Sequence, residues 1–92
     1  MVIGMSINFP NASRAYDATR NAVHFWGYDR TLEASFYVSA DALQRLAPGA
    51  MHDEPALLAA FDRHLSKIRA AAARRYGSSG KGGSYDLHPS DF

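Results

Sequence analysis

Between residues 22 and 38, apolar side chains alternate with polar or amphipathic ones at a period of two. In a β-strand this period places successive side chains on opposite faces. With a two-residue turn at 29–30, the segment predicts a β-hairpin in which Phe25 lies opposite Ala34. A longer turn that includes Thr31 remains an alternative and would shift the register by one.

The two faces of this predicted hairpin differ in chemistry. One face is aliphatic and phenyl, and it suits a protein core. The other face carries His24, Trp26, Tyr28 and Tyr37. Aromatic side chains with a polar end can pack against neighbours and still reach water. We therefore take this second face as the first candidate binding site.

Two helices are predicted after the hairpin. Ser39 can cap a short helix over about 40–47. Asp53 is a favourable N-cap for a longer helix over about 54–76. The apolar positions of the longer helix fall within an arc of about 100°, which is typical of a helix that packs on one side of a sheet.

The predicted core joins this longer helix to the sheet. The helix residues expected in it are Leu57, Phe61, Leu65 and Ile68. The sheet residues expected to oppose them are Ile7, Phe9, Val23, Phe25, Leu32, Phe36 and Val38.

Together these elements predict an α+β fold, in which a small antiparallel sheet of three to five strands has both helices packed on it. Short alternating segments at 5–9 and 13–17 are expected to supply further strands. Residues 77–84 are rich in glycine and serine, which predicts a flexible linker to an edge strand at 85–87. The chain length corresponds to a single domain spanning 1–92.

The composition excludes several kinds of site and argues against some classes of partner. The sequence has no cysteine, which excludes disulfides and thiolate chemistry. Its four histidines are scattered without metal-ligand spacing, so we predict neither a metal site nor a cofactor. The formal net charge of +1 argues against a dedicated nucleic-acid binder. Neither a signal peptide nor a run of about 20 apolar residues is found, so we expect a cytoplasmic protein with no membrane partner.

A set of core and turn residues runs along nearly the whole chain. It comprises Ile7, Asn8, Phe9, Pro10, Asn11, Ser13, Tyr16, Asp17, Val23, Phe25, Trp26, Gly27, Leu43, Asp91 and Phe92. This pattern resembles the small bacterial proteins grouped as domain of unknown function 1488. The resemblance implies a compact α+β domain and brings no catalytic residues. It also implies that residues 1–4 precede the usual start of such proteins, so we expect them to be a disordered extension.

A second candidate site is basic. Arg63, Lys67 and Arg74 fall within about 40° of one another on the predicted 54–76 helix, opposite its apolar arc. Such a stripe can contact phosphates. Basic residues near a helix end also complement the helix dipole, which explains them without a ligand. Combined with the aromatic face, the stripe makes single-stranded nucleic-acid binding an alternative function.

Catalytic chemistry has little support in the sequence. His24 beside Ser35 and Glu33 comes nearest to a triad, but Glu33 is only diagonal to His24 in the predicted register, and nothing supplies an oxyanion hole. The glycine-rich 77–84 segment lacks the spacing of a phosphate-binding loop. We therefore predict no catalytic residue and a non-enzymatic interaction module that binds a protein partner or forms a homodimer. A small-molecule enzyme is a further alternative.

Overall fold

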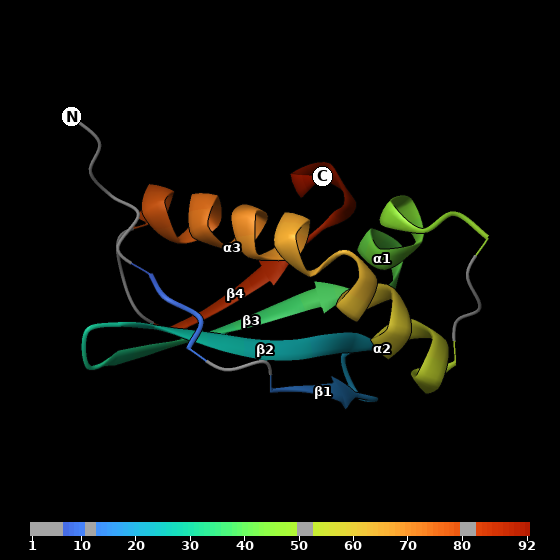
Figure 1. Cartoon of the computed structure of the whole chain (residues 1–92), viewed down its shortest axis with the longest axis horizontal. Coiled ribbons are helices and arrows are strands. Elements are labelled where there is room, and N and C mark those ends of the chain that lie inside the picture. The colour runs from blue at the N-terminus through green and yellow to red at the C-terminus, as the bar shows by residue number, and fades with distance from the viewer. Residues whose placement is uncertain (1–6, 11–12, 50–52, 80–82) are drawn as a thin grey trace.

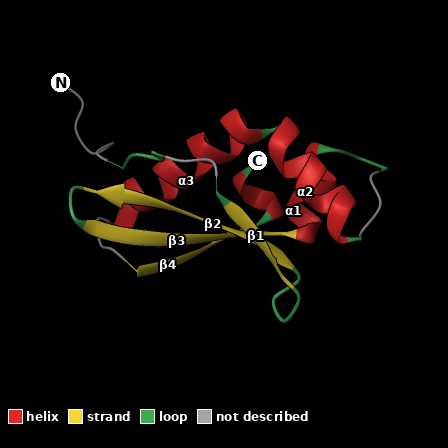
Figure 2. Cartoon of the chain, turned by 60° about the horizontal axis from the view of Figure 1, so that its bottom comes forward, coloured by secondary structure: helices red, strands yellow, loops and turns green. Residues whose placement is uncertain are grey.

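Figure 1 shows a computed structural model of the chain, which describes residues 7–10, 13–49, 53–79 and 83–92. The elements in these ranges are β1 (Arg14–Asp17), β2 (Ala22–Asp29), β3 (Leu32–Ser39), α1 (Ala40–Leu46), α2 (Glu54–Arg63), α3 (Leu65–Ser79), β4 (Gly83–Leu87) and a 3-10 turn, η1 (Pro89–Asp91). The strands form one sheet in the order β1-β2-β3-β4. The helices lie on one side of it (Figures 1 and 2). The predicted α+β class is confirmed.

The β2–β3 hairpin has the predicted faces but a different register. Phe25 pairs with Phe36, not with Ala34. The turn consists of Arg30 and Thr31, and Arg30 adopts a positive φ of 61°. Moving a two-residue turn along by one residue moves each cross-strand partner by two. A shift by two keeps every side chain on its predicted face, although the predicted partners are wrong.

The core lies between the sheet and the helices. Its largest fully buried side chains are Phe36, Phe61, Leu43, Leu57, Ile68, Leu87, Val23 and Val38. Leu32 was expected in this core but is 57% exposed. It pairs with Asp29 next to the turn, where the hairpin extends past the end of α3 (Figure 1). No helix covers it there, and this corrects the prediction for Leu32.

The predicted helix over 54–76 is interrupted. α2 ends at Arg63 and α3 begins at Leu65, with His64 between them at φ −109° and ψ 25°. The backbone N–H and C=O of His64 still make helical hydrogen bonds, so the junction is a bend and not a loop. No proline or glycine stands at this point. The apolar pattern alone therefore does not reveal the bend.

Both predicted helix caps are present. The Ser39 hydroxyl oxygen accepts a hydrogen bond of 3.1 Å from the Ala42 N–H, at the start of α1. The Asp53 carboxylate accepts one of 3.0 Å from the Ala56 N–H, at the start of α2. Each cap satisfies a backbone donor that the helix itself cannot pair.

The sheet is mixed, which corrects the antiparallel prediction. β4 runs parallel to β3, with Tyr85 beside Phe36. A parallel neighbour requires a crossover connection, and α1, α2 and α3 supply it. Residues 77–79 of the expected linker continue α3, and residues 83–84 begin β4. The residues between them lie outside the described part of the chain, as does the expected 1–4 extension.

The N-terminal strands are shorter than predicted. The segment expected at 13–17 is β1, which pairs with β2. From the segment expected at 5–9, Asn8 forms an isolated antiparallel bridge with Tyr28. Two backbone hydrogen bonds of 2.7 Å join these two residues. Residues 5 and 6 are outside the described residues.

The segment after β4 packs against the helices. The carbonyl oxygen of Phe92 accepts a hydrogen bond of 3.3 Å from Arg45, and that of Asp91 accepts one of 3.1 Å from Arg74. The Phe92 side chain packs against the core cluster. The C-terminus therefore lies on the helix side of the sheet and does not cover the opposite face (Figure 1).

Candidate functional site

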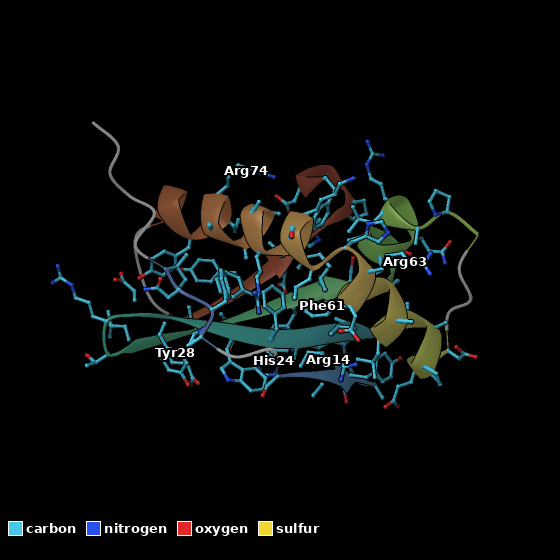
Figure 3. All side chains as sticks on the ribbon, viewed as in Figure 1. Arg14, His24, Tyr28, Phe61, Arg63 and Arg74 are labelled. Atoms are coloured by element: carbon cyan, nitrogen blue, oxygen red, sulfur yellow. The ribbon has the colours of Figure 1, made fainter. Side chains whose placement is uncertain are left out.

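The sheet face turned away from the helices carries the four predicted residues His24, Trp26, Tyr28 and Tyr37, which we call the aromatic face. All four side chains are half-buried. Figure 3 shows His24 and Tyr28 on the far side of β2 from the helices. The alternation in the sequence therefore identified residues that the fold does bring together.

The register arranges this face in three rows across the strands. The first row is His24, Tyr37 and Asp86, the second is Trp26, Ser35 and Ser84, and the third is Tyr28 and Glu33. Beyond Trp26, the second row contains only small side chains. It therefore separates the ring and carboxylate of the first row from those of the third.

His24 is the centre of a ring cluster. Its ring centroid is 4.4 Å from that of Tyr37, and the two rings are nearly parallel at 13°. The Trp26 ring is 4.8 Å away and tilted by 48°. Contacts of this kind are worth about 0.5–1.5 kcal/mol each beyond the area they bury. They restrain the orientation of the three rings.

The environment of His24 favours the neutral imidazole. Burial lowers its pKa, the carboxylates of Asp17 and Glu33 oppose that shift, and the charge of Arg20 adds to it. Among the described residues, the buried Nε2 atom of His24 has no hydrogen-bond partner. Protonation at Nε2 would create a buried N–H donor without an acceptor.

We expect the folded pKa of His24 to lie below its ordinary value of about 6.5. A base with a lowered folded pKa binds its proton more readily in the unfolded chain. Its contribution to stability is complete above about pH 6.5 and is lost as the pH falls through the folded pKa. An NMR titration of the His24 ring protons measures this pKa directly.

The matching stability measurement is urea unfolding of wild type and His24→Phe at several pH values. Phenylalanine keeps an aromatic ring beside Tyr37 but cannot titrate. The variant is expected to lose part of the acid sensitivity of the wild type. Equal sensitivity in both proteins, or a midpoint for His24 above 6.5, would contradict the prediction.

Charged side chains flank the rings at the first row. The guanidinium carbon of Arg20 lies 4.0 Å from the ring centroid of Tyr37. Its nitrogens lie 3.8 Å from the carboxylate of Asp17 and 3.5 Å from that of Asp86. These residues could not be predicted from the sequence, because Arg20 comes from the β1–β2 turn and Asp86 from the parallel strand β4. No local pattern reveals that these two segments meet.

At the third row, the Tyr28 hydroxyl donates a hydrogen bond of 2.9 Å to Glu33 Oε2. This bond raises the pKa of Tyr28. Glu33 therefore binds Tyr28 and not His24, while Ser35 lies opposite Trp26. The described residues thus do not assemble the His24–Ser35–Glu33 arrangement that the sequence analysis considered.

The predicted basic stripe lies elsewhere. Arg63 ends α2, whereas Lys67 and Arg74 belong to α3, and all three are exposed. Figure 3 shows Arg63 and Arg74 on the helix side, across the sheet from the aromatic face. The structure does not bring the stripe and the aromatic face together.

Two features are absent from the described ranges of the chain. There, no three histidine, aspartate or glutamate side chains gather in a way that could hold a metal ion. In the same ranges, no helix combines the length and the apolar character needed to cross a membrane.

Comparison with known proteins gives three findings. The structure is similar to the crystal structure, at 1.60 Å resolution, of a protein of unknown function of the DUF1488 family from Shewanella loihica PV-4. The TM-score is 0.81 and the identity 18%, over 94% of this chain and 96% of that chain, so the likeness shows the fold. None of the curated proteins matches the chain. The model of the family described as "Protein of unknown function (DUF1488)" matches residues 7–88, and the chain therefore belongs to this family, as the resemblance in its sequence predicts.

Proposed function

We propose that this chain is a non-enzymatic interaction module whose aromatic face binds a protein partner or a second copy of the chain. The observation that carries the proposal is the one-sided packing of the sheet. The helices and the segment after β4 lie on one side, whereas no described helix lies over the aromatic face, where the Arg20 side chain reaches the Tyr37 ring (Figures 1 and 3). The four rings remain half-buried there.

The organisation of the rings suits this role. Trp and Tyr are enriched at the centres of protein interfaces, where they bury a large area at a low conformational-entropy cost. Here the stacking of His24 on Tyr37 and the contact of His24 with Trp26 restrict the rings further. A restrained surface loses little entropy on binding.

The other functions have weaker support. A nucleic-acid strand would have to contact both the aromatic face and the basic stripe, which lie on opposite sides of the sheet. An enzyme needs a pocket with paired acid and base groups. The surface hollow of about 680 Å³ beside the aromatic face is lined by Asn8, Phe9, Pro10, Tyr28 and Arg30. This lining contains neither a histidine nor a carboxylate. A second hollow, of about 280 Å³ beside Tyr37, is lined by both Asp86 and His88, but Asp86 is already paired there with Arg20 at 3.5 Å.

The test uses Trp26, which is the only tryptophan in the sequence. In dilute protein we expect red-shifted emission that small quenchers reduce readily. Trp26→Ala is expected to lower the free energy of unfolding by about 1–2 kcal/mol, because the side chain is only half-buried. The same change is expected to weaken binding by about tenfold or more, as for a hot-spot residue.

Binding is measured by sedimentation velocity for self-association and by affinity capture from cell extract for a partner. Arg63→Ala is the control, since it alters the exposed basic stripe on the other side of the sheet. Association that Trp26→Ala abolishes and Arg63→Ala retains supports the proposal. Blue, quencher-protected emission from dilute monomer, or association that depends on Arg63 and not on Trp26, would refute it.

A further inference from the structure

The first row of the aromatic face shows how this surface holds a guanidinium group. Arg20 stacks on the Tyr37 ring at 4.0 Å, while Asp17 and Asp86 place carboxylates at 3.8 and 3.5 Å from its nitrogens. A planar cation above an aromatic ring and beside a carboxylate gains from both the ring quadrupole and the ion pair. One end of the face is therefore an occupied arginine site.

The third row has the same chemical components as the first row, an aromatic ring and a carboxylate. Tyr28 provides a ring, and Trp26 lies next to it on the same face of β2. Glu33 provides a carboxylate, of which Oε2 accepts the Tyr28 hydrogen bond and Oε1 is left over for a cation. Among the described residues, no lysine, arginine or histidine forms an ion pair with Glu33. Arg30 stands in the adjacent turn, and no ion pair joins it to Glu33.

The charge around the rings favours a basic partner. Three carboxylates, Asp17, Glu33 and Asp86, lie on the same side of the sheet as the aromatic face, against two guanidinium groups, Arg20 beside Tyr37 and Arg30 in the turn beside Tyr28. The chain as a whole has a net charge of +1. The attraction for cations is therefore local to this face and is not a property of the whole protein.

We propose that Trp26, Tyr28 and Glu33 form a recognition site for an arginine side chain of a basic protein segment. The proposal rests on the proposed function and specifies the chemistry of the partner. The guanidinium lies against the rings of Trp26 and Tyr28 and pairs with Glu33, as Arg20 does with Tyr37 and Asp86 at the other end of the face. Arginine suits this site better than lysine, because its planar group stacks on a ring while it donates to a carboxylate.

The probe is a capped pentapeptide of sequence Gly-Arg-Ser-Arg-Gly. Its reference is the same peptide with citrulline at both arginine positions, which keeps the shape and removes the charge. Binding is followed through the emission of Trp26 and through the NMR signal of its indole N–H. We expect the arginine peptide to bind about fivefold to tenfold more tightly than the citrulline peptide, from one exposed ion pair and one cation–π contact.

Two matched variants locate the effect. Glu33→Gln is expected to reduce the preference for arginine to about twofold or less, because it removes the charge and keeps the side-chain length. Glu54→Gln makes the same chemical change at the exposed start of α2 and should leave the preference intact. Both positions are exposed, so both variants are expected to fold.

The outcomes distinguish this inference from the proposed function. If both peptides bind equally and Trp26→Ala abolishes both, the arginine site is refuted and the interaction module stands. If neither peptide binds while quenchers still reach Trp26, the arginine site is again refuted and the interaction module again stands. If Trp26 is protected from quenchers in dilute monomer and neither peptide binds, both proposals fail.

Lys81 lies outside the described residues, so the Lys81→Gln variant is titrated with both peptides to test whether Lys81 itself pairs with Glu33. Arginine-selective binding by that variant alone would also refute the arginine site in the native chain.

Discussion

Phe36→Ala is expected to lower the free energy of unfolding by about 3–5 kcal/mol, the usual range for removing a buried phenyl ring. The side chain is 0% exposed. Its ring stacks between those of Phe25 and Tyr85, with centroids 5.3 and 5.4 Å away, and it also contacts Phe9 at 5.9 Å. The truncation thus opens a cavity where three strands meet the helices. A domain of this length has a total stability of roughly 5–14 kcal/mol, so the loss is a large part of it.

Urea unfolding measures this loss, and two further variants are measured for comparison with Phe36→Ala. Phe36→Leu keeps most of the volume and is expected to remain folded at a cost of about 1–2 kcal/mol, which gives a value even where the alanine variant unfolds. Leu32→Ala in the same strand is the control, because Leu32 is 57% exposed and should lose less than about 0.5 kcal/mol. A loss at Leu32 as large as that for Phe36→Leu would contradict the exposed position of Leu32 and support its predicted place in the core.

The hairpin shows why its faces could be predicted and its register could not. Alternation identifies which side chains share a face, and that assignment is unaffected when the turn moves from 29–30 to 30–31 and partners shift by two. The turn itself depends on Arg30, which adopts φ 61° although such angles favour glycine. Sequence preferences therefore gave no reason to place the turn there, and the predicted partner of Phe25 was wrong.

The remaining differences arise from tertiary packing. The bend at His64 has no proline or glycine to mark it, and the parallel direction of β4 follows from the path of the helices rather than from residues 83–87. The same limit applies to the candidate site. The period of two within one hairpin predicts that its four rings share a face. Arg20 and Asp86 reach those rings from a turn and a distant strand, which local patterns do not connect.

The second large effect is expected at Gly27, where β2 meets the N-terminal segment. A Cβ atom at this position would lie 2.8 Å from the carbonyl oxygen of Asn8, 2.8 Å from Phe9 Cε1 and 3.0 Å from Ile7 Cγ1. The phenyl ring of Phe9 can move aside, but the Asn8 oxygen belongs to the backbone and accepts the Tyr28 N–H at 2.7 Å. Gly27 is therefore required because two backbone segments approach closely, not because of its φ angle.

We expect Gly27→Ala to lower the free energy of unfolding by about 1–3 kcal/mol, as for overpacking in a core, and Gly27→Val to lower it further. The Ala variant should also speed hydrogen exchange at the Tyr28 amide, because the added methyl group pushes away the oxygen that this amide binds. Gly77→Ala on the exposed end of α3 is the control, and it should be neutral or slightly stabilising. If Gly27→Ala were as harmless as Gly77→Ala and the Tyr28 amide stayed protected, residues 7–10 could not pack on β2 as described. A loosened Tyr28 would in turn weaken its bond to Glu33, so the same variant should reduce the preference for the arginine peptide without altering any residue of the aromatic face.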